Sequence, residues 1–228
     1  LISSIFLAGE GFICMFIILI ILCIPYYIGI LVGLFIRKKI WLKNTTLGIV
    51  TIMLFAAYNT VPEYSNPVLI KDEVIINKPA SSVWQLLIQP VNFGTSQNFF
   101  FKRGVSYPQS MKLDTIDGQQ RLNVQYNNGS ILAPITEFRD SVSFAFFLND
   151  DLVSMKEMNV YKESHTMHLQ NHFIIDYGKF EVIPQSDSTC KLVTYTQYRH
   201  KFQPNIYTDL WVTYFTHQLH KHVLSTFQ

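Results

Sequence analysis

The sequence predicts an α+β domain, a curved antiparallel sheet around a long C-terminal helix, preceded by transmembrane helices. Three observations predict this: a long uncharged apolar run near the start, a series of alternating segments separated by turns, and an amphipathic segment at the end. The chain is 49% hydrophobic and 15% charged, but its uninterrupted apolar sequence lies in the first sixty residues. We therefore expect a membrane region over residues 1–60 and one soluble domain over residues 61–228.

The first apolar run extends from Gly11 to Ile36 and carries no charged residue. At about 1.5 Å per helical residue, it is longer than a hydrocarbon core of roughly 30 Å, so it predicts a transmembrane helix over about residues 11–36. Pro25 inside it is tolerated in lipid when neighbouring groups satisfy the freed carbonyl. The alternative is a buried core helix, although uncharged runs beyond about 18 residues are rare in soluble domains.

A second uncharged stretch, Asn44 to Pro62, is shorter and more polar, and it predicts a second transmembrane helix over about residues 44–60. A short loop with basic residues and no acidic residue joins the two stretches, and such loops prefer the cytoplasmic side. Its basic residues are Arg37, Lys38, Lys39 and Lys43. We therefore expect an integral membrane protein whose soluble domain is extracytoplasmic. Because the sequence begins at Leu1 rather than at a methionine, we also expect further sequence upstream.

The soluble domain opens with a predicted strand, Val68 to Ile76, followed by a helix over Ala80 to Ile88. The helix is indicated by apolar residues at helical spacing, namely Val83, Trp84, Leu87 and Ile88. The next segment, Pro90 to Ser110, is irregular and aromatic, and it is interpreted as a short helix or a structured loop.

Period-2 patterns then predict consecutive strands with short turns, which is typical of an antiparallel sheet. Asp117 and Gly118 mark one of these turns, and Asp150 to Ser164 is expected to be a longer connection with some helix. The predicted strands are Lys112–Ile116, Leu122–Tyr126, Ser130–Phe138, Val142–Leu148, Asn171–Pro184 and Thr189–Phe202.

The last segment, Asn205 to Phe227, has the spacing of a long amphipathic helix. Its apolar face is predicted from Val212, Phe215, Leu219 and Val223. Because an antiparallel sheet needs its apolar face covered, we expect the sheet to curve around this helix and to leave a pocket between them.

This order of elements resembles the START-like, or SRPBCC, superfamily of polyketide cyclases and lipid-transfer proteins. The resemblance covers about residues 69–227, and the segments that carry it are VIINKPASSVWQLL (74–87), GSILAPITEF (129–138), GKFEVIP (178–184) and the last helix with Trp211. It implies a helix-grip fold and a cavity for a hydrophobic ligand, with enzymatic activity in some branches. It implies no cofactor.

A narrower resemblance is to membrane-anchored, uncharacterised members of that superfamily. It is carried by GEGFICM (9–15), FKRGVSYP (101–108) and LHKHVL (219–224). In those relatives an acidic residue precedes the proline of the strand that matches ILAPIT, whereas Ala133 stands there in this chain. Any acid chemistry at that point is therefore expected to be absent.

The candidate ligand-binding residues are side chains that could line an apolar cavity and supply hydroxyl or ionisable groups. They are Tyr126, Ile135, Glu137, Phe146, Tyr177, Tyr195, Trp211, Tyr214 and His217. The alternative for the aromatic residues is simple core packing. Glu137 and His217 are the candidates for acid–base chemistry, although strand carboxylates commonly face solvent.

Several classes of function lack sequence support. A net charge of +2 without a long basic run argues against nucleic acid as a partner. No nucleophilic triad, phosphate loop or paired cysteine motif is recognisable, so no catalytic residue and no cofactor is assigned. His217, His220 and His222 do not share one helix face, so surface histidines are preferred over a metal site.

The sequence leaves three hypotheses. The leading one is a membrane-anchored protein that binds a hydrophobic small molecule or lipid. The second is an enzyme of the cyclase or dehydratase type in the same cavity, which a buried Glu137 or His217 would favour. The third is a structural or interaction module with a filled core and no ligand.

Overall fold

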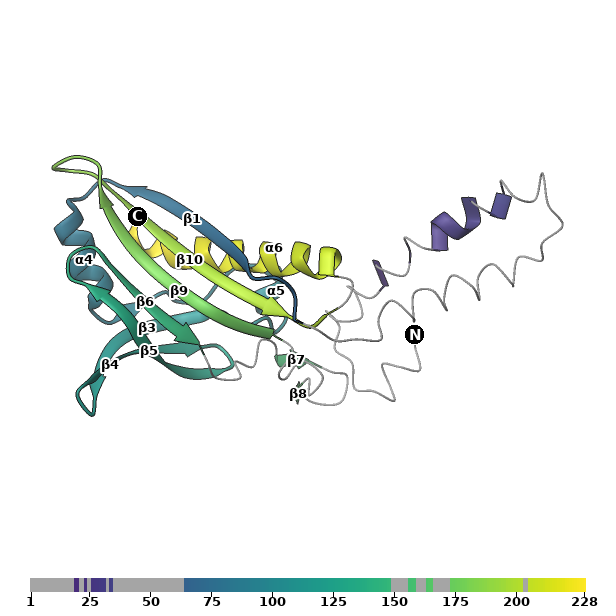
Figure 1. Cartoon of the computed structure of the whole chain (residues 1–228), viewed down its shortest axis with the longest axis horizontal. Helices are drawn as coiled ribbons and strands as arrows, with labels where there is room; N and C mark the ends of the chain where they lie inside the picture. The colour runs from purple at the N-terminus through teal and green to yellow at the C-terminus, as the bar shows by residue number, and fades with distance from the viewer. Residues whose placement is uncertain are drawn as a thin grey trace.

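A curved sheet and one long helix form the main body of the computed structural model (Figure 1). The structure describes residues 64–148, 156–158, 163–165, 173–202 and 205–228, together with helical residues 19–20, 23, 26–31 and 33–34. The predicted membrane helix over residues 11–36 is thus described only in part. The one over residues 44–60 lies wholly outside the described residues.

The elements follow the predicted order of strand, helix, further strands and final helix. The strands are β1 (Val68–Ile76), β2 (Val91–Asn92), β3 (Pro108–Ile116), β4 (Gln119–Tyr126), β5 (Gly129–Arg139), β6 (Ser143–Leu148), β7 (Lys156–Met158), β8 (Glu163–His165), β9 (Phe173–Pro184) and β10 (Cys190–His200). The helices are α4 (Ala80–Ile88), α5 (Phe99–Lys102) and α6 (Asn205–Leu224), and a short 3-10 turn, Ser225–Phe227, ends the chain.

Eight of the described strands form one sheet in the order β1-β10-β9-β6-β5-β4-β3-β2, and every pairing in it is antiparallel. The sheet curls strongly, and α6 lies along its concave side (Figure 1). This is the helix-grip arrangement that the sequence predicts. The separate pair β7 and β8 forms a small second sheet.

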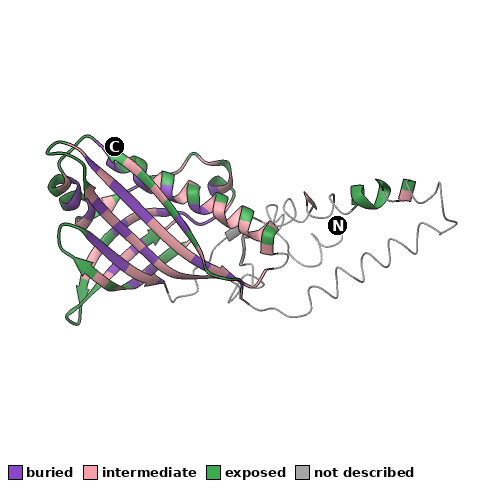
Figure 2. Cartoon of the chain, turned by 45° about the horizontal axis from the view of Figure 1, so that its top comes forward, coloured by how far each residue is buried: buried purple, intermediate pink, exposed green. Residues whose placement is uncertain are grey.

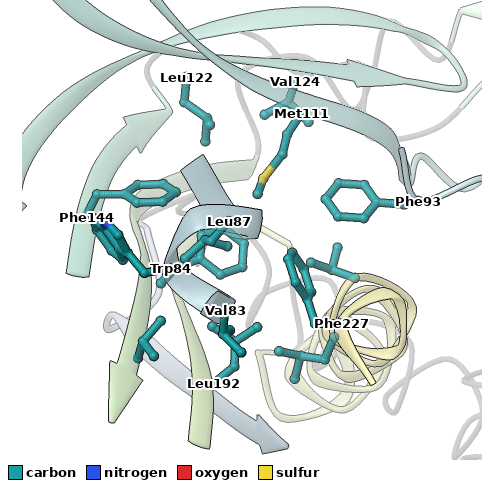
Figure 3. Packing of buried hydrophobic residues seen from close by; sticks show 14 of the residues in the cluster. Val83, Trp84, Leu87, Phe93, Met111, Leu122, Val124, Phe144, Leu192 and Phe227 are labelled. Carbon is teal, nitrogen blue, oxygen red and sulfur yellow. The ribbon is translucent and has the colours of Figure 1, made fainter. Parts of the chain in front are cut away.

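The main core surrounds α4 (Figure 3), which lies at one end of the curled sheet (Figure 1). Val83, Trp84 and Leu87 are at most 1% exposed, as the helical spacing of the sequence predicts. The indole of Trp84 contacts the rings of Phe138 and Phe144, with centroids 5.7 and 6.3 Å apart. Its Nε1–H also donates a hydrogen bond of 3.1 Å to the Asp140 carboxylate. Burial of this apolar surface is the main favourable term for the domain.

A second, smaller core cluster lies where α5 meets α6. Phe101, Val105 and Tyr107 are buried there, and Phe215 and Leu219 of α6 pack against them. The rings of Phe101 and Tyr107 stack with their centroids 5.2 Å apart. The domain interior is therefore built as two clusters of buried residues rather than as one.

Helix α6 is less buried than its length suggests, because exposed and half-buried residues dominate it (Figure 2). Its buried residues are Thr216, His220, Val223 and Leu224, all in the C-terminal half. The predicted apolar face was only partly right: Val223 is buried, but Val212 and Phe215 are half-buried while polar Thr216 and His220 face the sheet. Polar residues of α6 can be buried here because β1 and β10 carry polar partners for them, Asp72 and Thr196.

One predicted strand boundary and one predicted connection differ from the observed structure. Strand β3 begins at Pro108 instead of Lys112, because residues 108–111 find pairing partners in β4. Within Asp150 to Ser164, the described residues are strand, since Lys156–Met158 pairs with Glu163–His165. The rest of this connection, where some helix is expected, lies outside the described residues. Strand pairing joins separate segments of chain, and periodicity within one segment does not show it.

Candidate functional site

The inner face of the sheet, which faces α6, is the candidate site. Successive side chains of a strand point to opposite faces, so the buried residues identify which face is inner. Tyr126, Ile135 and Phe146 lie on it, in register with core residues such as Val124 and Phe144. Each of the three is apolar and only half-buried, and each packs at the margin of the main core. The structure thus brings three of the nine predicted site residues to one apolar surface.

Tyr126 supplies a polar group to this surface. Burial raises the pKa of its phenol from 10.0 to about 12, because removal from water disfavours the phenolate. The group is therefore neutral at physiological pH. A neutral hydroxyl on an apolar wall is the usual means of orienting an apolar ligand that carries one polar atom.

The ring of Phe146 covers the backbone of Gly178 on the neighbouring strand. A β-carbon at position 178 would overlap that ring, so the glycine is what allows the close approach. Phe146 and Gly178 are directly paired in the β6–β9 ladder, and Ile135 is the partner of Phe146 on β5. The contact fixes where the Phe146 ring lies on the inner face.

Three predicted site residues, Glu137, Tyr177 and Tyr195, lie on the outer face of the sheet. The Tyr195 hydroxyl donates a hydrogen bond of 3.0 Å to Glu181, and Glu137 pairs with exposed Arg139 at 2.6 Å. For Tyr177, burial raises the phenol pKa, and the charged neighbours that influence it belong to this same outer face. These three side chains cannot contribute to a site beneath α6.

The remaining three predicted residues are on α6, where they differ in position. Trp211 is half-buried and contacts the ring of Phe100, with centroids 6.0 Å apart. Tyr214 is exposed. His217 lies at the edge strand β1, where its Nδ1 is 2.8 Å from a carboxylate oxygen of Asp72. Its side chain is 45% exposed, so it lies at the rim and not inside the grip.

A polar chain that the sequence did not predict lies at the centre of the α6–sheet contact. It consists of Asp72 on β1, His220 on α6 and Thr196 on β10. Asp72 Oδ2 is 2.6 Å from His220 Nδ1, and the Thr196 hydroxyl is 2.8 Å from His220 Nε2. Asp72 also contacts His217, so one carboxylate forms hydrogen bonds with two histidines of the last helix.

The protonation of His220 follows from its burial. Burial lowers the pKa of His220 below its usual 6.5, although Asp72 acts in the opposite direction. Neutral His220 then donates Nδ1–H to Asp72 and accepts the Thr196 hydroxyl at Nε2. Because both ring nitrogens are engaged, neither is available to a substrate. The chain therefore serves to hold α6 on the sheet.

We expect the stability of the domain to fall as the pH drops below 6.5, the ordinary pKa of histidine. His220 binds its proton less readily in the folded state than in the unfolded state, so acid favours unfolding. His222, whose pKa burial also lowers, acts in the same direction. Urea unfolding followed by far-UV circular dichroism at a series of pH values measures this dependence. His220→Gln is expected to reduce the slope, and an unchanged slope would contradict the assignment.

A second polar cluster holds the N-terminal half of α6. His200 is fully buried, and its Nε2 is 2.9 Å from the Asp209 carboxylate. The Tyr198 hydroxyl lies 3.2 Å from the Thr213 hydroxyl on the same helix. Asp209 and Thr213 thus face β10, and this half of α6 contributes no buried residue. Polar contacts, rather than apolar packing, join it to the sheet.

Neither acid–base candidate from the sequence is buried. The Glu137 side chain is 37% exposed on the outer face, and His217 lies at the rim. Within the described part of the chain, no three His, Cys, Asp or Glu side chains are placed to hold a metal ion. A search of the same described residues finds no helix long and apolar enough to cross a membrane.

Comparisons with known proteins give similarity at the level of structure alone. No protein-family model and no curated relative matches the sequence. The chain is similar to the protein XoxI from Bacillus cereus, at 14% identity and a TM-score of 0.43, over 71% of this chain and 93% of that one. It is similar to a START superfamily protein from Mycobacterium smegmatis, at 10% identity and a TM-score of 0.39, over 70% and 96%.

A third similar structure is norcoclaurine synthase from Thalictrum flavum in complex with dopamine and hydroxybenzaldehyde. The identity is 10% and the TM-score 0.38, over 64% of this chain and 75% of that one. These similarities are distant, so the helix-grip description of this chain rests on its own element order and sheet topology.

Proposed function

We propose that this chain is a membrane-anchored protein whose helix-grip domain binds a hydrophobic small molecule or lipid on the inner face of its sheet. The observation that carries the proposal is the incomplete filling of the interior. All buried residues of α6 lie in its C-terminal half, while Tyr126, Ile135 and Phe146 of the inner face stay half-buried. An apolar ligand that covers half-buried apolar side chains on a concave face removes them from water, and this favours binding.

The same arrangement favours binding over the other two hypotheses. An acid–base enzyme needs an available ionisable group beside its ligand, yet both nitrogens of buried His220 are engaged. A purely structural module would bury the inner apolar residues fully. A ligand held by apolar contacts and one neutral hydroxyl, that of Tyr126, fits the residues better.

Membrane anchoring is supported by the first part of the chain. Residues 11–36 carry no charge, and the described residues within that run are helical. Tyr26, Ile28 and Leu31 among them are exposed, which suits side chains that face lipid. The basic loop at residues 37–43 favours the cytoplasmic side, so a second span over residues 44–60 would bring the soluble domain outside the cytoplasm. A reporter enzyme fused after Gln228 tests this orientation, and cytoplasmic activity of the reporter would overturn it.

Native mass spectrometry of the full chain, released from detergent micelles, tests ligand binding. We expect an apolar molecule to remain bound to the wild type and to be lost from Ile135→Trp. The larger indole would occupy the space over the half-buried inner face beside Phe146 and exclude the ligand.

The matched control is Ile75→Trp, because Ile75 is an exposed apolar residue of β1 that faces away from α6. It is expected to retain the ligand. Lipid carried by the N-terminal apolar segment should be the same in all three proteins. If no adduct distinguishes Ile135→Trp from the wild type, the inner face binds nothing, and the structural-module hypothesis replaces this one.

A further inference from the structure

The N-terminal half of α6 carries a row of exposed apolar side chains on the side away from β10. Ile206 is 83% exposed, Leu210 67% and Tyr214 39%. Residues four apart lie on one side of a helix, so the three form a continuous stripe. Asp209 and Thr213 engage β10, so the stripe does not face the sheet. Apolar side chains gathered on one exposed face mark a surface that meets a partner or a membrane.

Helix α5 extends this stripe. Phe99 is 55% exposed, and its ring contacts Phe100 with centroids 5.4 Å apart. Phe100 in turn contacts Tyr214, with centroids 5.8 Å apart. Phe99, Ile206, Leu210 and Tyr214 therefore belong to one surface, which we name the α5–α6 apolar face.

Basic side chains border this face. Lys102 and Arg103 are exposed at the end of α5, and the Arg103 guanidinium lies 5.3 Å from the centre of the Phe99 ring. The single acidic residue of α6 is Asp209, whose carboxylate is directed to His200. Exposed aromatic and aliphatic residues beside Lys and Arg are the combination that binds the interfacial layer of an anionic bilayer.

The face also lies at the end of the domain where the chain arrives from its apolar segment. The Ser65 amide donates a hydrogen bond of 2.7 Å to the His200 carbonyl, and α6 begins five residues after His200 at Asn205. The Lys201 ammonium is 4.2 Å from the centre of the Tyr64 ring. Tyrosine and lysine at this junction suit the level of the lipid headgroups. The first turns of α6 are thus tied to the point of membrane attachment.

We propose that the α5–α6 apolar face lies in the interfacial layer of the bilayer that anchors the chain, with Lys102 and Arg103 against anionic headgroups. This inference rests on the proposed membrane anchoring, but not on ligand binding. It fixes the orientation of the domain, with α6 next to the membrane surface and the outer face of the sheet turned away from it.

Photocrosslinking in vesicles tests the inference. The full chain is reconstituted into vesicles of equal parts phosphatidylcholine and phosphatidylglycerol, with p-benzoyl-phenylalanine placed at position 210 or position 99. Irradiation is expected to link both positions to lipid. The control position is 75, where the native isoleucine is 65% exposed on the outer face of the sheet. It is expected to capture no lipid.

Flotation of the same vesicles separates the two proposals. If the chain floats with the vesicles but positions 210 and 99 capture no lipid, anchoring holds and the apolar face is not membrane-bound. Crosslinking of position 210 to a second copy of the chain would likewise overturn the inference. If the chain does not float, membrane anchoring fails and the inference fails with it.

The basic border is tested by charge reversal. The double variant Lys102→Glu with Arg103→Glu, and vesicles of phosphatidylcholine alone, are each expected to reduce lipid capture at position 210 at least about threefold, because basic residues near an anionic surface attract its headgroups. Equal capture under all conditions would show that the headgroup charge plays no part and would overturn that element of the proposal.

Discussion

Replacing Trp84 with alanine is expected to lower the free energy of unfolding of the domain by about 3–5 kcal/mol. Trp84 is 1% exposed and is among the largest fully buried side chains of the described residues. Its removal would leave a cavity between α4 and the rings of Phe138 and Phe144. It would also leave Asp140 without the indole hydrogen bond. Urea unfolding of the full chain in detergent, followed by far-UV circular dichroism, measures the change.

Two further variants test whether this loss of stability comes from the core. Trp84→Phe keeps an aromatic ring against Phe144 but removes the hydrogen bond to Asp140, so we expect roughly half the loss. Ile75→Ala removes an exposed side chain and is expected to stay within about 0.5 kcal/mol of the wild type. A loss below about 1 kcal/mol for Trp84→Ala would mean that α4 does not organise the core, since buried aromatic truncations cost several times more.

The elements that local patterns specify were predictable from the sequence. Helix α4 has its predicted bounds, and three of its four predicted apolar residues are buried while Ile88 is half-buried, because the spacing of apolar residues in a helix specifies its buried side. Strand β1 likewise has its predicted bounds, and the other strands of the main sheet appear within a few residues of their predicted positions, except the two-residue β2, which was not predicted. Pro90 to Ser110 contains the short helix α5, one of the two alternatives that its aromatic sequence left open.

The facing of Glu137 could not be predicted, because a β-bulge changes the alternation of the strand that carries it. On β5 the register shifts between Ile135 and Glu137, so residues two apart point to opposite faces. A bulge depends on the pairing of two strands, so the sequence of one strand alone does not predict it.

Tyr177 and Tyr195 are different, because the spacing within each strand contained a signal. An odd separation places two side chains of a strand on opposite faces. Tyr177 lies three residues before Phe180, which is buried, with no register shift between them. Tyr195 lies three residues before Tyr198. Tyr198 is fully buried beneath α6, so Tyr195 belongs to the outer face. Treating every strand tyrosine as a cavity candidate overlooked this parity.

The contact between Asp72 and His220 could not be predicted from the sequence, for another reason. The two residues are 148 positions apart, and no local pattern joins an aspartate in the first strand to a histidine in the last helix. The amphipathic prediction for α6 assumed an apolar contact with the sheet. The real contact includes a buried histidine and a threonine, so the predicted helix face was rotated from the observed one.

Replacing Asp72 with alanine is expected to destabilise the domain by about 2–3 kcal/mol, the range for losing hydrogen bonds to a charged group and leaving a buried donor unpaired. The change removes the acceptor of the 2.6 Å contact with buried His220 and the partner of His217. Asp72→Asn keeps one acceptor oxygen and should cost less. Chemical unfolding of the three proteins at neutral pH measures these differences.

The matched control is Asp114→Ala, which removes a carboxylate that bridges Lys112 and Asn123 on a sheet surface remote from α6. It is expected to change the free energy of unfolding far less than Asp72→Ala does, as is typical of an exposed ion pair. If Asp72→Ala costs no more than this control, the polar chain is not what fixes α6. Because the N-terminal half of α6 has no buried residue, such a result would leave the polar contacts of Asp209 and Thr213 to hold that half of the helix over the inner face of the sheet.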